Sequence, residues 1–125
     1  MSGCYKGPFR KVCIDYICVQ AEIVDSVQER GIGLMFRERL LDNRAMLFVF
    51  DKEAQYSFWM ENMKFPLDII WINRNKKIVD IRTNVLPCGQ RCKSLLPQYP
   101  AQYVLEVCAG FADRYQVKVG QQVNF

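Results

Sequence analysis

The hydrophobic residues of this 125-residue chain occur in short runs separated by polar residues, glycine and proline, a pattern typical of β-strands. Four runs follow one another through the middle of the chain, over residues 45–50, 55–60, 68–72 and 77–81. Consecutive strands with short connections usually pair, so we expect an antiparallel meander in sequence order. The run at 69–72 is apolar throughout, which indicates burial on both faces as in a barrel, with Ile70 or Trp71 in the core.

A first β region is predicted before the meander. Residues 11–24 are rich in apolar and β-branched side chains and form either a hairpin or one long bent strand. In an unbroken strand Cys13 and Cys18 would point to opposite faces. We therefore interpret them as two buried thiols that pack as small hydrophobic residues.

One helix is predicted in the N-terminal half. Ser26 and Glu29 have the spacing of a capping box, which predicts that a helix begins there and continues to about Phe36. Gly31 and Gly33 each disfavour a helix, by about 1 kcal/mol relative to alanine. Their presence indicates that another backbone packs close to this helix.

The C-terminal part combines a long loop with further secondary structure. Residues 85–101 contain Pro87, Pro97 and Pro100 and read as a loop. A strand with Glu106 embedded in it, a short helix and an edge strand follow, over residues 103–108, 109–115 and 117–123.

Composition excludes several classes of site. The chain has no histidine, which removes a Ser-His-Asp triad, a Cys-His pair and histidine-ligated zinc. Its net charge of +4 comes from basic residues spread along the chain, so we expect no nucleic-acid partner. We expect no cofactor and no metal.

The domain and compartment follow from length and hydropathy. We expect an irregular leader over residues 1–9 and one compact domain over residues 10–125. No apolar run approaches the roughly 18 residues of a membrane helix, so the chain is expected not to be transmembrane. The first residues lack the apolar segment of a signal peptide, so we expect a soluble protein, cytoplasmic if this is the full native chain.

Cysteine chemistry centres on the long loop. Six cysteines allow fifteen pairings, and their number alone assigns none. Cys88 and Cys92, four positions apart, could close a turn as a disulfide or form half of a metal site; no second pair with zinc-ribbon spacing accompanies them. A proline-rich loop of this length needs a restraint, so we expect these two thiols to be bonded or close enough to bond.

The stretch 57–72 contains the most distinctive polar residues. Asn62 and Asp68 lie between large apolar side chains, and each could simply cap the connecting turn. A buried carboxylate otherwise needs an amide or a cation, and the guanidinium of Arg37 is a suitable partner. We therefore expect Arg37, Asn62 and Asp68 to form one polar cluster beside Trp59.

The ordered motifs resemble a known family, DUF192, also called UPF0127, over about residues 20–123. The motifs are Gly33-Leu34-Met35-x-Arg37, Met46-Leu47-Phe48-Val49-Phe50, Phe58-Trp59-Met60-x-Asn62, Pro66-Leu67-Asp68, Tyr103-Val104-Leu105-Glu106 and Ala109-Gly110. The resemblance implies a mainly β (α+β) fold with a strongly curved antiparallel sheet or barrel-like meander and short helices.

The resemblance also bears on chemistry and compartment. It implies no settled activity, frequent export in bacteria or archaea, and a cysteine pair at Cys88 and Cys92. This chain departs from the family by lacking the leader of exported members and by having Cys108 where a polar residue such as asparagine is expected. The second departure suggests an extra bond or a buried thiol.

Three functions compete. The leading hypothesis is a non-enzymatic ligand-binding or adaptor module with an aromatic and methionine-lined groove, which would bind a small molecule, a glycan or a protein. The alternatives are a small enzyme, using Asp68 with Glu106 as paired carboxylates or Cys88 with Cys92 as redox thiols, and soft-metal binding by Met60 and Met63. The candidate ligand-binding residues are Arg37, Trp59, Met60, Asn62, Asp68 and Glu106.

Overall fold

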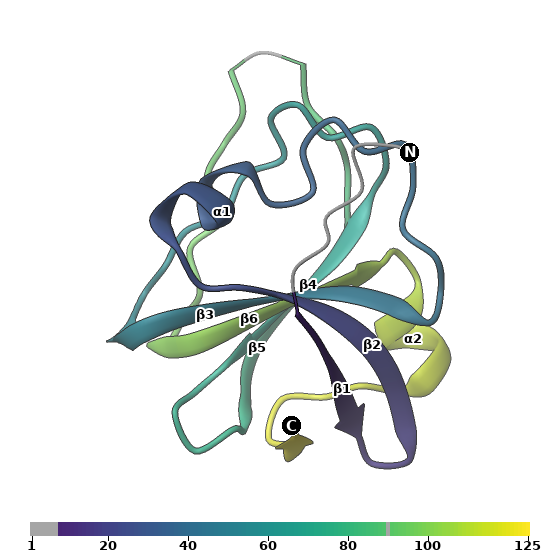
Figure 1. The fold of residues 1–125 in the computed structure, drawn as a ribbon, viewed down its shortest axis with the longest axis vertical. Helices are drawn as coiled ribbons and strands as arrows, with labels where there is room; N and C mark the ends of the chain where they lie inside the picture. The colour runs from purple at the N-terminus through teal and green to yellow at the C-terminus, as the bar shows by residue number, and fades with distance from the viewer. Residues whose placement is uncertain (1–7, 90) are drawn as a thin grey trace.

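The computed structural model describes residues 8–89 and 91–125, which fold into a mainly β domain (Figure 1). In chain order the elements are β1 (Phe9–Ile14), β2 (Ile17–Val24), α1 (Val27–Ile32), β3 (Arg44–Ala54), β4 (Leu67–Ile72), β5 (Ile78–Val85), β6 (Ala101–Cys108), α2 (Phe111–Tyr115) and β7 (Val123–Asn124). Most of the expected leader at 1–9 lies outside the described residues, and Phe9 already belongs to β1.

Within the described residues, seven strands form one curled sheet in the order β5-β4-β6-β3-β2-β1-β7. Neighbouring strands are antiparallel except β2 and β3, which run parallel because α1 and the loop after it carry the chain back between them. Figure 1 shows α1 and the long connections above the strands as drawn, with α2 at the right and the C-terminal end low in the view. The predicted curled, mainly β fold with a helix in each half is confirmed.

The predicted meander is wrong in its pairing order. β3 and β4 are not neighbours, because β6 returns from the C-terminal half and lies between them. Residues 55–60 are not a strand of the sheet but an extended segment with a bridge between Phe58 and Leu95. β4 and β5 do pair through a tight hairpin, as expected. β4 is buried along its whole length, so it needs a neighbour on each side, and the second neighbour comes from far along the chain.

Cys13 and Cys18 form a disulfide, so their interpretation as two free thiols is wrong. β1 and β2 form a hairpin that turns at Asp15, which has a φ of 54°, and the two cysteines face each other across it. Their Cα atoms are 4.0 Å apart, near the spacing of a non-hydrogen-bonded pair, where side chains approach most closely. The opposite-face argument failed because the strand is broken by this turn.

Each face of the sheet carries its own hydrophobic cluster. Ile70 and Leu105 belong to the cluster that includes residues of α2. Phe48 and Trp71 belong to the other cluster, beneath the loop after α1 and the long connections. Ile70 and Trp71 are both fully buried, as predicted, because successive strand residues point to opposite faces and both faces are covered.

α1 begins where the capping box predicts and ends earlier than expected. The Ser26 hydroxyl accepts a hydrogen bond from the Glu29 backbone N–H at 3.1 Å, and the Glu29 carboxylate accepts one from the Ser26 N–H. The helix stops before Gly33, which has a φ of 52° and would place a Cβ 3.2 Å from the Phe48 ring. A Cβ at Gly31 would meet nothing within 4 Å, so the expectation of a closely packed backbone is wrong there.

Asp68 is fully buried and satisfied by backbone amides. Its carboxylate accepts hydrogen bonds from the N–H groups of Asn84 (2.8 Å), Ala112 (2.8 Å) and Gly110 (3.4 Å). Gly110 is the N-cap of α2 and has no side chain to cap it, so Asp68 supplies the cap from β4. The predicted partnership with Arg37 is therefore wrong: donors brought together by the fold satisfy this carboxylate.

Replacing this carboxylate should destabilise the fold. Asp68→Asn keeps the shape but turns an amide NH2 towards backbone N–H groups, leaving at least one of them without an acceptor. We expect a loss of about 3 kcal/mol in the free energy of unfolding, in the range for buried hydrogen bonds to a charged group. Urea denaturation followed by tryptophan fluorescence measures it. Asp51→Asn, at an exposed position of β3, is the matched control; equal midpoints for the two variants would contradict the assignment.

Candidate functional site

A cavity of about 490 Å³ opens on the face of the sheet beneath α1. Its walls come from the end of α1 and the turn after it, from β3, from the extended segment 55–63 and from β6. Pockets of this volume are of the size that holds small organic molecules. The apolar side chains that line it include Leu34, Met35, Phe48, Phe50, Phe58 and Met63.

Glu106 is the carboxylate of this cavity. It lies in the middle of β6, directly opposite Met46 on β3 and Ile69 on β4, both fully buried apolar residues. The residue is only 4% exposed, and no hydrogen bond or ion pair to it is found in the described part of the chain. No fully buried side-chain oxygen of the described residues lacks a partner, so the carboxyl group must reach the open cavity. Burial raises its pKa to about 8.

Aromatic rings line the same cavity as the carboxyl group. Phe50 and Tyr56 stack with their ring centroids 3.6 Å apart, and Phe48 meets Phe58 edge-on with centroids 4.9 Å apart. Trp59 also lines the cavity and is 45% exposed. These contacts order the aromatic side chains of the wall, and their exposed parts can pack on a ligand.

Arg30 is the second charged residue of the lining. Its Nη1 donates to the backbone oxygens of Asp25 (2.6 Å) and Val49 (2.9 Å). The guanidinium also lies 4.7 Å from the centroid of the Phe50 ring. Arg30 thus ties α1 to β3, and its contacts are structural.

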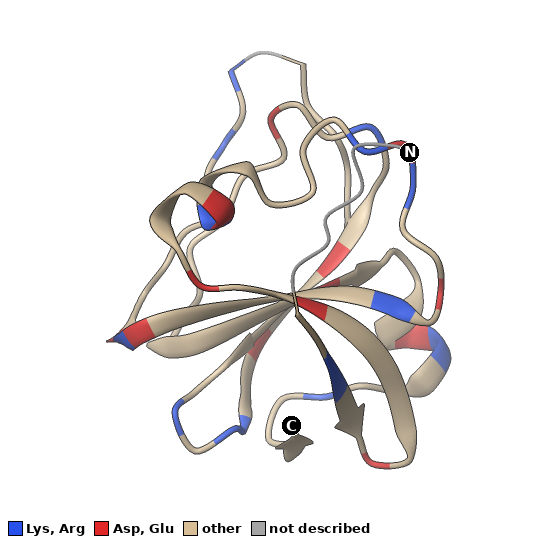
Figure 2. Ribbon diagram, in the orientation of Figure 1, with Lys and Arg blue, Asp and Glu red and all other residues tan. Residues whose placement is uncertain are grey.

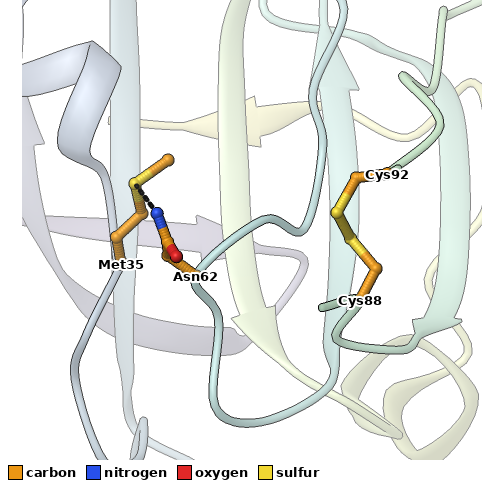
Figure 3. The surroundings of a disulfide bond; sticks show 4 residues. All are labelled: Met35, Asn62, Cys88 and Cys92. Atoms are coloured by element: carbon orange, nitrogen blue, oxygen red, sulfur yellow. Dashed lines mark hydrogen bonds between the residues drawn. A yellow bond between two sulfur atoms is a disulfide. The ribbon is translucent and has the colours of Figure 1, made fainter. Parts of the chain in front are cut away.

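The outer wall of the cavity is braced by the long loop. Phe58 and Leu95 exchange backbone hydrogen bonds of 3.0 and 2.7 Å, and Glu61 forms a bridge with Cys88. Cys88 and Cys92 are bonded to each other, which confirms the predicted disulfide (Figure 3). The disulfide therefore closes the loop that holds the segment 55–63 in place.

The sequence-predicted site residues do not form one cluster. Glu106 and Trp59 line the cavity. Met60 is buried in the core behind it. Asn62 is exposed, and its side-chain amide points to the Met35 sulfur at 4.0 Å (Figure 3).

Arg37 and Asp68 also lie apart from the cavity lining. Arg37 forms a bidentate ion pair with Glu22 of β2, with N–O distances of 2.5 and 3.0 Å. This pair anchors the loop after α1 to the sheet. The predicted cluster of Arg37, Asn62 and Asp68 is wrong, because Glu22 and the backbone amides around α2 offer better partners to the two charged groups.

Sequence reasoning missed Arg30, Gly31 and Tyr56 as lining residues. Gly31 carried a signal, since a helical glycine without a packing partner leaves space, but that space appears only once α1 lies over β3. Arg30 lies near the C-terminal end of α1, and Tyr56 lies in the extended segment 55–63. Nothing in their sequence context distinguishes them.

Three further findings concern the described residues. In the described residues, no group of three or more histidine, cysteine or acidic side chains is arranged to hold a metal ion. The described helices are also too short to span a membrane. Cys108, the free thiol of the described cysteines, hydrogen-bonds to Asp42 at 3.3 Å, and burial together with that carboxylate raises its pKa to about 11.

Comparisons with known proteins give a family but no activity. A sequence model of the DUF192 family, described as uncharacterized ACR, matches residues 11–125. UPF0127 protein PF1050 of Pyrococcus furiosus is 27% identical over 111 residues, which cover 87% of this chain and 89% of that protein. Two curated relatives from Thermococcus are longer, and the match covers 64% and 65% of their lengths.

Two solved structures share the fold. A protein of unknown function from Novosphingobium aromaticivorans has a TM-score of 0.88 and 29% identity, covering 94% of this chain and 85% of that one. A protein from Sinorhizobium meliloti, provisionally described as a transcription regulator, has a TM-score of 0.86 and 26% identity, covering 98% and 97%.

The buried acid predicts an unusual pH dependence of stability. Because the pKa of Glu106 rises from 4.5 to about 8 on folding, the folded state binds the extra proton and stability falls as pH rises through this window. The full difference is on the order of 5 kcal/mol. In urea denaturation, Glu106→Gln should have the same free energy of unfolding as the wild type near pH 4.5. Its advantage over the wild type should then grow up to pH 8. Glu38→Gln, whose side chain is 80% exposed, is the control; a parallel pH profile for Glu106→Gln and wild type would refute the assignment.

Proposed function

Because this chain belongs to the DUF192 family, whose description states no activity, we propose a function from the cavity itself. We infer that the protein is a non-enzymatic binding module that holds a small, largely apolar molecule in the cavity, with the polar group of that molecule at Glu106. The observation that carries the proposal is a buried, unpaired carboxyl group facing a cavity that aromatic and methionine side chains line together with a few polar ones.

Such a carboxyl group has no structural reason to be there. A leucine or methionine at position 106 would pack between Met46 and Ile69 without the cost of burying an acid. Perturbed ionisable groups in clefts are typical of functional sites. The cost to stability is therefore expected to be recovered when a ligand supplies the missing partner.

The paired-carboxylate hydrolase is disfavoured by the sheet geometry. Glu106 is paired with Ile69, so the two share a face, while the adjacent Asp68 points to the opposite face. The Asp68 carboxylate is moreover occupied by backbone amides at α2. These two acids cannot act on one substrate.

The thiol and copper alternatives receive no better support. Cys88 and Cys92 are joined in a bond that braces the cavity wall, and the raised pKa of Cys108 makes it a poor nucleophile. Of the two methionines considered for copper, Met63 lines the cavity whereas Met60 is buried in the core. A pair of converging sulfurs would have favoured a metal site.

A nucleic-acid partner is also disfavoured. The relative from Sinorhizobium meliloti carries a description connected with transcription. In this chain, however, basic residues are interspersed with acidic ones over strands and loops (Figure 2). Nucleic-acid binding requires a continuous basic surface, so a small molecule is the partner we propose.

A ligand-detected screen tests the module. Small fragments that combine a ring or alkyl group with one polar group should bind the wild-type protein in ligand-observed NMR. Gly31→Phe should reduce their affinity about tenfold or more, equivalent to about 1.4 kcal/mol, because the new ring occupies the cavity or its mouth. The free energy of unfolding should not fall, since removing a helical glycine favours α1.

Val27→Phe provides the matched control. Val27 lies on the same helix, is 78% exposed and does not line the cavity, so this variant should bind fragments as the wild type does. Fragments that bind wild type and Gly31→Phe equally would place binding elsewhere. A screen without any binder would overturn the proposal of a binding module.

A further inference from the structure

The cavity offers a ligand one unpaired carboxyl group and a lining rich in aromatic side chains. The Glu106 carboxyl group lies at the base, on the sheet, with the apolar neighbours Met46 and Ile69 on the two flanking strands. Phe50 and Tyr56 belong to the wall, where Phe50 stacks on Tyr56 and lies beside the Arg30 guanidinium. A ligand must therefore satisfy an acid while being packed by rings.

The chemistry of these groups selects among ligand classes. A neutral alcohol can hydrogen-bond to the carboxyl group in either protonation state but forms no ion pair with it. An anion would be repelled as soon as Glu106 ionises. An ammonium group gains most, because it forms a charge-assisted hydrogen bond and an ion pair with the carboxylate.

We propose that the cavity binds a small organic ammonium, an alkyl or arylalkyl amine whose N–H groups donate to the Glu106 carboxylate while its apolar part packs among the aromatic side chains. This inference rests on the proposed binding function and names the ligand class for that site. The cavity volume of about 490 Å³ is ample for such a molecule.

Arg30 is the lining residue that would favour an anionic ligand, but its contacts weaken this alternative. Its guanidinium donates from Nη1 to two backbone oxygens and lies over Phe50, so these contacts hold it in place at the wall. Glu106 has no partner among the described residues. The unpaired group at the base is therefore expected to select the ligand.

Binding of an ammonium should release a proton. Around Glu106, β3 and β4 present apolar Met46, Phe48 and Ile69. The other charged or titratable groups of the described cavity lining are Arg30 from α1 and Tyr56, whose hydroxyl donates to the Lys52 backbone oxygen. The pKa of Glu106 is about 8, so at pH 7 the carboxyl group is mostly protonated and its proton leaves to the buffer as the ammonium binds.

Three matched probes test the ligand class: 2-phenylethylamine, 2-phenylethanol and 3-phenylpropionate. Isothermal titration should give the amine the highest affinity at pH 8. Because binding needs the ionised acid, amine affinity should rise about tenfold from pH 6 to 7 and about fivefold from pH 7 to 8. Titrations in buffers of different ionisation enthalpy should detect close to one proton released at pH 7, and the alcohol should show neither effect.

Variants make the test specific to the carboxyl group. Glu106→Gln should lose the preference for the amine and its pH dependence, while still binding the alcohol. Glu38→Gln removes the same charge at an exposed position and should behave as wild type. Its unchanged titration would exclude a general effect of net charge.

The possible failures are distinguishable. If the alcohol or the propionate binds as tightly as the amine at pH 8, or if Glu106→Gln keeps the amine preference, the ammonium class is wrong although the binding module stands. If none of the three probes binds and the fragment screen finds no binder sensitive to Gly31→Phe, both proposals fail. Amine binding with Glu106-dependent proton release supports both.

Discussion

The place of β6 between β3 and β4 is the constraint on which the rest of the structure depends. Both edges of β6 are hydrogen-bonded, so its side chains alternate between two covered faces. Leu105 and Val107 pack on the side of α2, and Val104 and Glu106 face the other side. Because β6 separates β3 from β4, the chain between these strands must cross over the sheet. That crossing segment is the outer wall of the cavity.

Two buried carboxylates on adjacent central strands show that the surroundings of a buried acid decide whether it stabilises the fold. Asp68 receives three backbone hydrogen bonds and caps α2, so its charge is part of the fold. Glu106 receives none from the described residues, and burial raises its pKa to about 8. One acid therefore stabilises the domain, and the other is an unfavourable element that only a further partner can satisfy.

The features that sequence reasoning predicted correctly are those set by nearby residues. The capping box at Ser26 and the Cys88–Cys92 disulfide each join positions three or four residues apart. The pairing order of the strands and the partner of Asp68 depend on segments more than 30 residues away, on β6 and α2. Cys13 and Cys18 lie close in sequence, yet their bond depended on a turn at Asp15 that the pattern left open.

The same distinction governs the candidate site. Glu106 and Trp59 were identified because an acid within an apolar strand and a tryptophan beside a methionine are unusual wherever they occur. Gly31 could not be assigned, because its significance is the space it leaves, and that space exists only after the crossover of α1 above β3. A cavity is a property of several distant segments at once. The chain therefore reveals which residues are costly to bury, and the fold reveals that the costliest of them, Glu106, faces room for a ligand.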